Sequence, residues 1–317
     1  MPSVQFGAQL WSQAEWPDFR QSAIAAEAAG WDSIWTWDHL LAIFGPWDQP
    51  ILEGWTTLAG VAALTSKVRL GLMVGANTFR NPGLTAKLAT TLDHISGGRA
   101  ILGIGGAWFE REHEAFGIEF GSSIGQRLDW LDEAVGLMRR LLDGERVTHD
   151  GPAYRMVDAL CEPRPIQHRL PILIGGSGPR KTLRTVARLG DGWNTGGTIE
   201  EVRERIGILE EHCGDVGRDP AEIEMTVSFP IMIRNEARRA EADWAALIAR
   251  NGATDAGSVP HLLGSPELVA DGLRPYLDLG FRTVIVRMPA PFDRETIDRI
   301  GEVRERLGEV ALAQPHG

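Results

Sequence analysis

An adjacent aspartate and histidine, Asp38 and His39, have the side chains that proton transfer requires. They closely follow Ser33–Thr36, a short apolar run that predicts a buried β-strand. A histidine exchanges a proton near neutral pH, and small changes in its environment move that exchange across the physiological range. A lone histidine is more often structural, but its place at a predicted strand end favours a functional role for His39. We therefore treat Asp38 and His39 as the candidate catalytic pair.

Glycine-rich segments follow three other predicted strands. These segments are Gly105-Gly106, Gly175–Gly178 and the glycines after Thr195. Glycine lets the backbone approach a flat ligand, and backbone N–H groups ahead of a helix bind anions. The segment Gly175–Gly178 precedes a helix expected to begin at Pro179, so we expect it to hold a phosphate group, with Arg180, Lys181 or Thr182 assisting. Ordinary turn formation is the alternative interpretation of these glycines.

Other catalytic motifs are incomplete. The stretch Gly175–Thr182 resembles a P-loop, but Arg180 stands where that motif requires glycine. A dinucleotide fingerprint begins at Gly103, but Trp108 occupies its third glycine position. No dense histidine and glutamate spacing is present, so no metal site is expected, and a Gly-x-Ser-x-Gly nucleophile elbow is missing. The other histidines considered are expected to be structural or solvated: His94, His113 and His149.

The pattern that positions these residues alternates strand-like and helix-like runs. The expected strands are Val4–Leu10, Ser33–Thr36, Val68–Val74, Ala100–Ile104, Pro171–Ile174, Gly192–Asn194, Glu224–Phe229 and Thr283–Arg287. Such alternation requires a parallel sheet, and eight units in about 300 residues favour an α/β fold closed into a (β/α)₈ TIM barrel. An open, doubly wound sheet is the alternative. In a barrel the carboxyl ends of all strands meet at one face, which would bring the candidate residues together.

Helix signals separate these strands. The expected helices are Pro17–Ala29, Trp55–Leu64, Pro82–Ser96, Ile124–Leu142, a helix opened by Thr198 and Glu201, one from Pro266 to near Gly280, and Arg294–Leu307. Residues 143–169 predict a small hairpin inserted between barrel units. Pro275 predicts a kink or break in its helix. No linker divides the chain, so residues 1–317 are expected to form a single domain.

Composition narrows the function. A formal net charge of −11 argues against nucleic-acid and anionic-membrane partners. No apolar run is long enough to span a membrane, no secretory signal is visible, and the two cysteines form no disulfide framework, so a cytoplasmic location is expected. Eleven tryptophans, several of them early in the chain, indicate either a tryptophan-rich core or the wall of a pocket for an apolar or planar ligand.

Taken in order, these segments resemble the bacterial-luciferase-like monooxygenase superfamily, and within it the class that uses the deazaflavin coenzyme F420. The matching segments are Gly30–His39, Val68–Val74, Phe79–Pro82, Leu92–Arg99, Leu102–Trp108, Pro171–Gly176, Asp191–Asn194 and Gly217–Pro220. The likeness extends over residues 4 to 230 and is weak beyond Phe229. The ordered set is far more specific than any single segment.

The resemblance implies a flavin-type ring at the carboxyl-terminal mouth of a luciferase-like barrel, with Asp38 and His39 beside it. It also implies a non-proline cis peptide bond at Met73–Val74 against the ring face. The expected ring contacts are Met73, Val74, Asn77, Gly105 and Gly106. The expected contacts of the phosphate end are Gly175, Gly176, Ser177, Gly178 and Thr195, with Arg287 as a further candidate.

Function follows from the cofactor that the resemblance implies. With coenzyme F420 the protein would be a dehydrogenase or reductase that transfers hydride to or from a small organic substrate. With FMN it would be a monooxygenase that uses O₂ and a reductase partner, and a non-catalytic flavin-binding protein is a third reading. An aldolase is disfavoured because no lysine stands at a predicted strand end. The family commonly dimerises, which predicts a homodimer, while Trp108 replaces the glycine or acid of several relatives and leaves the substrate open.

Overall fold

The computed structural model describes residues 4–252 and 260–313. Over these ranges eight parallel strands form a ring, and β10 pairs with both β9 and β12, which closes the ring. The strands are β1 (Gln5–Leu10), β2 (Ser33–Thr36), β3 (Arg69–Leu72), β5 (Ala100–Gly105), β8 (Ile172–Gly175), β9 (Gly192–Thr195), β10 (Glu224–Ile233) and β12 (Thr283–Met288). The predicted (β/α)₈ barrel is confirmed, and closure excludes the open sheet.

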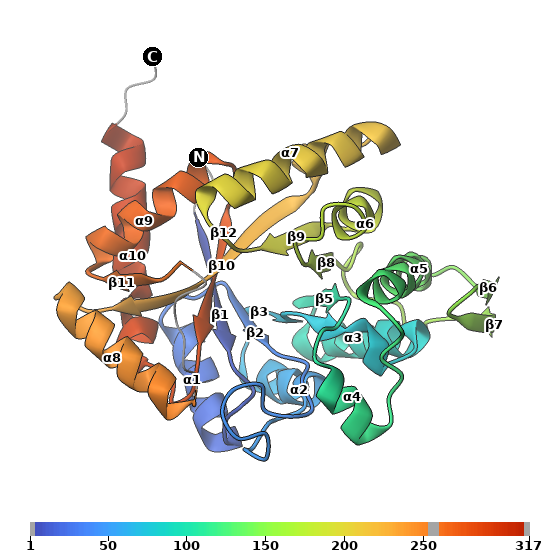
Figure 1. The fold of residues 1–317 in the computed structure, drawn as a ribbon, viewed down its shortest axis with the longest axis horizontal. Coiled ribbons are helices and arrows are strands. Elements are labelled where there is room, and N and C mark those ends of the chain that lie inside the picture. The colour runs from blue at the N-terminus through green and yellow to red at the C-terminus, as the bar shows by residue number, and fades with distance from the viewer. Residues whose placement is uncertain (1–3, 253–259, 314–317) are drawn as a thin grey trace.

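Helices surround the strands (Figure 1). They are α1 (Trp16–Ala28), α2 (Gly54–Leu64), α3 (Pro82–Ser96), α5 (Ile124–Leu142), α6 (Thr182–Leu189), α7 (Ile199–Val216), α9 (Pro266–Asp278) and α10 (Arg294–Ala313). Local signals set several helix starts. The Asn81 side chain accepts a hydrogen bond from the Gly83 N–H at the start of α3, and Thr198 forms a capping box with Glu201 at the start of α7.

Insertions decorate the barrel. The predicted hairpin is confirmed as β6 (Val147–Asp150) paired antiparallel with β7 (Arg155–Ala159). Additional elements are β4 (Gly75–Ala76), the 3₁₀ turns η1 (Asn77–Phe79) and η2 (Pro220–Glu222), α4 (Glu110–Phe116), α8 (Ala237–Arg250) and β11 (Leu262–Gly264). Helix α4 was not predicted, because its seven residues are mostly polar and carry no apolar stripe.

Three expectations need adjustment. Strand β10 is longer than predicted, because beyond the stretch paired with β12 it pairs with β11. Helix α6 begins at Thr182 rather than at Pro179, since a turn separates the glycine segment from the helix. Pro275 does not break α9, which continues to Asp278, and its position near the end of the helix limits the number of hydrogen bonds at stake.

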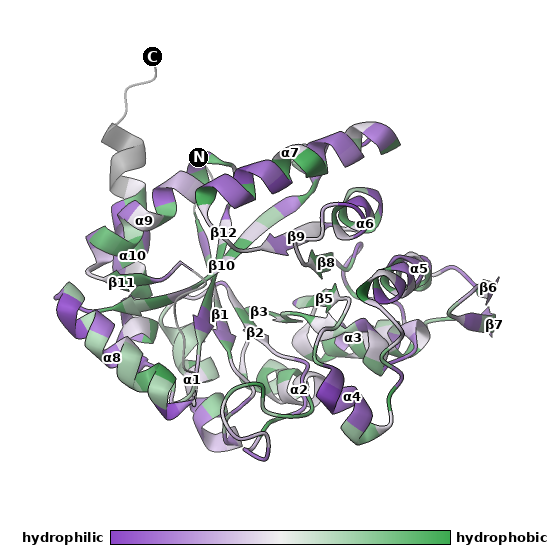
Figure 2. Ribbon diagram, viewed as in Figure 1, coloured by the Kyte–Doolittle hydropathy of each residue, from purple (hydrophilic) through white to green (hydrophobic). Residues whose placement is uncertain are grey.

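The core falls into three clusters of buried apolar side chains, the smallest of which joins Met232 of β10 to Trp244 and Ile248 of α8. Apolar side chains fill the layer between strands and helices, and the hydropathy colouring shows them along the strands and the inner helix faces (Figure 2). A smaller cluster packs inside the barrel, formed by Trp35, Met73, Ile101, Leu173 and Ile285 with Val74 against it. Because side chains alternate along a strand, Trp37 points the same way as Trp35, one layer nearer the mouth. The interior cluster therefore closes the barrel beneath the mouth.

Candidate functional site

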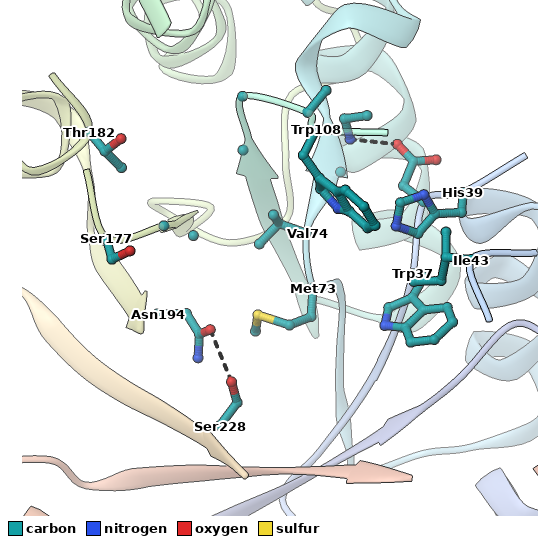
Figure 3. A pocket seen from close by; sticks show the side chains of 18 of the residues that line it. Trp37, His39, Ile43, Met73, Val74, Trp108, Ser177, Thr182, Asn194 and Ser228 are labelled. Atoms are coloured by element: carbon teal, nitrogen blue, oxygen red, sulfur yellow. Dashed lines mark hydrogen bonds between the residues drawn. The ribbon is translucent and has the colours of Figure 1, made fainter. Parts of the chain in front are cut away.

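A cavity of about 510 Å³ opens at the carboxyl ends of the strands. It collects most of the residues selected from the sequence: Asp38, His39, Met73, Val74, Gly105, Gly106, Gly175, Gly176, Ser177, Gly178 and Arg287. Figure 3 shows Trp37, His39 and Trp108 on one side and Ser177, Thr182 and Asn194 on the other, with Met73 and Val74 between them. The barrel thus brings residues from across the chain to one mouth.

His39 is held by a carboxylate that the sequence did not single out. Its Nδ1 lies 2.9 Å from Oε1 of Glu112, and the backbone N–H of Leu40 donates to Oε2 of the same residue at 2.8 Å. Glu112 is only 1% exposed and comes from α4. Glu110, Glu112 and Glu114 look alike in the sequence, so nothing local marks the middle one as the partner of His39.

This contact determines which nitrogen of His39 is available. A carboxylate accepts hydrogen bonds, so the contact assigns the proton to Nδ1 of His39. Among the described residues, Nε2 has no hydrogen-bond partner. Trp37 and Trp108 meet the imidazole edge-on, with ring centroids 5.9 and 5.6 Å away. The arrangement leaves Nε2 able to accept or donate a proton within an apolar surround.

Asp38 is engaged differently. Its two oxygens accept hydrogen bonds from Arg80 at 2.6 and 2.9 Å, and Oδ2 also accepts the Ala76 N–H at 2.9 Å. Burial raises the pKa of Asp38, and the contacts with Arg80 and Ala76 offset part of that effect. Arg80 also donates to Glu53, which caps the start of α2. We therefore propose that Asp38 positions the ends of β2 and β4 rather than carrying the proton, which changes the role expected from the sequence.

The floor of the cavity is the Met73–Val74 segment. Its peptide bond is cis, as the family resemblance implied, and the amide of Gln9 donates to the Met73 carbonyl at 2.9 Å. Gly105 and Gly175 flank Val74, and a Cβ at either position would lie 2.7 or 2.8 Å from a Val74 methyl group. Larger residues cannot occupy these two positions without moving Val74, so glycine keeps the floor flat.

The segment Gly175–Gly178 forms one end of the cavity. The Trp193 indole N–H donates to the Gly176 carbonyl at 2.8 Å, and the Gly176 N–H donates to the Asn194 carbonyl at 3.1 Å. Helix α6 follows at Thr182, and no side chain caps its first turn. Ser177, Thr182 and the backbone N–H groups at this end are suited to an anionic group.

Two residues selected from the sequence are not brought into the lining. The Asn77 amide instead donates to the Tyr154 hydroxyl at 2.9 Å, toward the inserted hairpin. The Thr195 hydroxyl accepts from Arg205 at 3.4 Å on the side facing α7. Both are buried, and both point away from the cavity. The position of a residue after a strand was therefore not enough to predict whether its side chain faces the cavity.

Aromatic residues form one wall of the cavity. The Trp11 ring lies 4.4 Å from Trp37 and 4.8 Å from Phe44, while Trp108 is 62% exposed at the rim. Trp31, Trp35 and Trp55 are core residues. The early tryptophans therefore divide between the core and the cavity wall, apart from the exposed Trp47, and an apolar or planar ligand stays a prediction.

The structure supports a structural role for the other histidines. Nδ1 of His113 bonds to the Phe109 carbonyl and Nε2 to the Thr78 hydroxyl, so both ring nitrogens have partners. His94 bonds to the Arg164 carbonyl, and His149 pairs with Glu133. None of the three lines the cavity.

Comparison with known proteins identifies the fold family. Residues 2–283 match the model of the luciferase-like monooxygenases. The chain belongs to the luciferase-like monooxygenase family. The resemblance drawn from the ordered motifs is thus confirmed.

The chain is also similar in sequence to individual curated proteins. An F420-dependent glucose-6-phosphate dehydrogenase of Nakamurella multipartita is 29% identical over 334 aligned positions, covering 95% of each chain. An uncharacterised protein of Mycobacterium tuberculosis is 32% identical over 168 positions, which cover 53% of this chain and 58% of that protein. The match thus spans little more than half the length of that relative.

Solved structures of other proteins share the whole fold. An F420-dependent secondary alcohol dehydrogenase, solved with an F420–acetone adduct, superposes with a TM-score of 0.81 at 21% identity, covering 96% of this chain and 99% of that one. At this identity the likeness establishes the barrel and no more.

In the described part of this chain, no helix is long and apolar enough to cross a membrane.

Proposed function

We propose that this luciferase-like protein is an F420-dependent oxidoreductase that transfers hydride between the deazaflavin and an alcohol or carbonyl group of a small organic substrate. The observation that carries the proposal is that His39, held by Glu112, lines the same cavity as the flat Met73–Val74 floor. Relatives named as F420-dependent dehydrogenases support the choice of cofactor.

The residues of the cavity fit such a cofactor. Val74 packs directly against Gly105 and Gly175, and a Cβ at either position would displace it toward the space proposed for a planar ring. Ser177, Gly178 and the uncapped first turn of α6 offer donors to a phosphate. We expect Met73, Val74, Gly105 and Gly106 to contact the ring, and Gly175–Gly178 the phosphate end. Bound F420 would supply the hydride donor or acceptor.

His39 handles the proton of the reaction. When an alcohol is oxidised, Nε2 accepts the hydroxyl proton as the adjacent C–H electron pair leaves as hydride, and the reverse reaction returns that proton to the carbonyl oxygen. Glu112 stabilises the charged imidazole and fixes its orientation. Trp37 and Trp108 exclude water from the imidazole. Each turnover would thus transfer one proton between the substrate and His39 and one hydride between the substrate and F420.

The protein is further proposed to act in the cytoplasm as a homodimer on a substrate that is apolar or planar. The aromatic wall of Trp11, Trp37 and Phe44 supports the substrate class. The net charge of −11 supports the absence of a nucleic-acid partner. Equilibrium sedimentation would test the dimer.

Cofactor titration tests the proposal directly. Purified protein is expected to quench F420 fluorescence and to gain thermal stability with F420 but not with FMN. Under anaerobic conditions it should oxidise reduced F420 when a suitable ketone is added. Stabilisation by FMN alone, with oxygen consumption when a flavin reductase is supplied, would instead identify a monooxygenase. Binding of neither cofactor would contradict the proposal.

A further inference from the structure

The two carboxylates that line the cavity have cationic or hydrogen-bonding partners, whereas the arginine that lines it faces no carboxylate of the described residues. Asp38 is paired with Arg80, and Glu112 with His39 and the Leu40 N–H. Arg287 lines the same cavity, and its one hydrogen bond within the described residues runs from Nη2 to the Ser228 hydroxyl at 3.0 Å. No carboxylate of the described chain lies within ion-pair distance of it. The cavity therefore holds one cation without a matching anion.

An unmatched guanidinium in this position is costly. Burial lowers the pKa of Arg287, and no acidic group within the described ranges opposes that effect. Three other arginines with little exposure, Arg80, Arg139 and Arg234, each face at least one carboxylate. A fourth, Arg127, lies over the ring of Phe120. A guanidinium has five N–H donors, and the Ser228 hydroxyl uses one. The remaining donors can bind an anion that enters the cavity.

The aromatic wall adjoins this cation. Gln9 of β1 is in register with Arg287 of β12. The backbone N–H of Trp11 donates to the carbonyl of Met288, the next residue on β12, at 3.0 Å. Trp11 packs on Trp37, which follows β2. Arg287, the aromatic wall and His39 thus follow one another along the neighbouring strands β12, β1 and β2.

We infer that Arg287 and Ser228 bind a carboxylate of the substrate, whose apolar part packs on Trp11, Trp37 and Phe44 and whose reacting hydroxyl or carbonyl group meets His39. The substrate is then an apolar hydroxy acid or keto acid. This inference rests on the proposed function, since it concerns the same cavity.

Charge and polarity favour that class over other anions. One guanidinium balances one carboxylate, whereas a phosphate dianion would call for a second cation, and neither a lysine nor a second arginine is in the lining. The wall of Trp11, Trp37 and Phe44 offers only two indole N–H groups as hydrogen-bond donors, so it suits the apolar part of a substrate better than the several hydroxyl groups of a sugar. Arg205 does not serve as the second cation, because it bonds to Thr195 and to the Gly196 carbonyl outside the cavity.

A matched pair of probes tests the inference. Isothermal titration calorimetry on the F420-loaded protein would compare 3-phenylpropanoate with 3-phenylpropanamide, which differ in charge and little in size. The wild type is expected to bind the acid about tenfold to a hundredfold more tightly. Arg287→Met should reduce that ratio to about one, while Arg287→Lys should keep part of it. The exposed Arg238→Met is the control and should keep the full preference.

The outcomes separate this inference from the proposed function. Equal binding of acid and amide by the wild type, or a preference that survives in Arg287→Met, would overturn the carboxylate site. F420 affinity, measured by fluorescence titration, should be equal in wild type and Arg287→Met, and its loss in the variant would place Arg287 on the cofactor instead. If the wild type fails to bind F420, the proposed function fails, and the same two probes on the free protein still decide the anion site. Arg287→Gln, which keeps a donor for Ser228, replaces Arg287→Met if that variant does not fold.

Discussion

The imidazole of His39 and the buried carboxylate of Glu112 meet at 2.9 Å although 73 positions separate them in the chain. Glu112 also holds the N–H of Leu40, so one side chain fixes both the ring of His39 and the backbone beside it. Helix α4, which carries Glu112, thereby couples the loop after β5 to the end of β2. The role proposed for His39 depends on this contact.

Replacement of His39 by alanine should reduce turnover far more than cofactor affinity. Loss of a positioned acid–base group typically costs a factor of about 10² to 10⁴ in rate. Steady-state kinetics with reduced F420 would give kcat, and fluorescence titration would give the Kd of F420. Equal losses in both quantities would count against a proton-handling role.

Glu112→Gln should lower kcat by about tenfold to a hundredfold with little change in the Kd of F420. The side-chain amide of the introduced glutamine would carry no charge to stabilise a charged imidazole, although its oxygen can still accept a hydrogen bond from the Nδ1–H of His39. The pH profile of kcat should therefore shift, which a purely structural role would not produce. Glu114→Gln is the matched control, because Glu114 is exposed on the same helix. An unchanged pH profile in Glu112→Gln would refute the assignment.

Gly175→Ala should weaken F420 binding by about tenfold or more. The added Cβ would lie 2.8 Å from a Val74 methyl group, so Val74 must shift into the space assigned to the ring. The double variant Gly175→Ala, Val74→Ala removes the clash and should recover part of the affinity. Titration of the single and double variants measures this coupling, and no recovery in the double variant would indicate another cause.

Arg80→Met should destabilise the fold by about 3–5 kcal/mol, because it leaves the carboxylate of Asp38 buried without its cation. Asp38→Asn in the same chain should restore part of the loss. Urea unfolding gives both free energies of unfolding. A small effect of Arg80→Met would mean that Asp38 is protonated in the fold.

Asp293 should make the fold sensitive to acid. Although burial opposes it, hydrogen bonds from Arg234 and Thr296 lower the pKa of Asp293 below its ordinary value. A carboxylate with a lowered pKa stabilises the fold above the pKa of the unfolded chain, near 4, and that stabilisation is lost as the pH falls through the folded value. Urea unfolding at pH 7 and at pH 3 should therefore show a smaller decrease for Asp293→Asn than for the wild type. Asp298→Asn, an exposed position on helix α10, which Asp293 directly precedes, should behave like the wild type.

The barrel and the region of the site could be predicted from the order of the residues alone. Alternating strand and helix signals set the parallel topology, and local glycines and caps such as Asn81 set where the elements begin and end. Because parallel strands end at one face, position in the chain was enough to bring His39, Val74, Gly105 and Gly175 to one cavity.

The contacts of each side chain at the site could be seen only in the folded structure. Asp38 turned out to be bound to Arg80, and Asn77 and Thr195 to point away from the cavity. The partner of His39 came from a polar helix without any periodic signal. That Arg287 faces no carboxylate among the described residues could be seen only in the closed barrel. Backbone conformation follows largely from neighbouring residues, whereas pairing and burial of a charge depend on groups that are distant in the chain and meet only after folding.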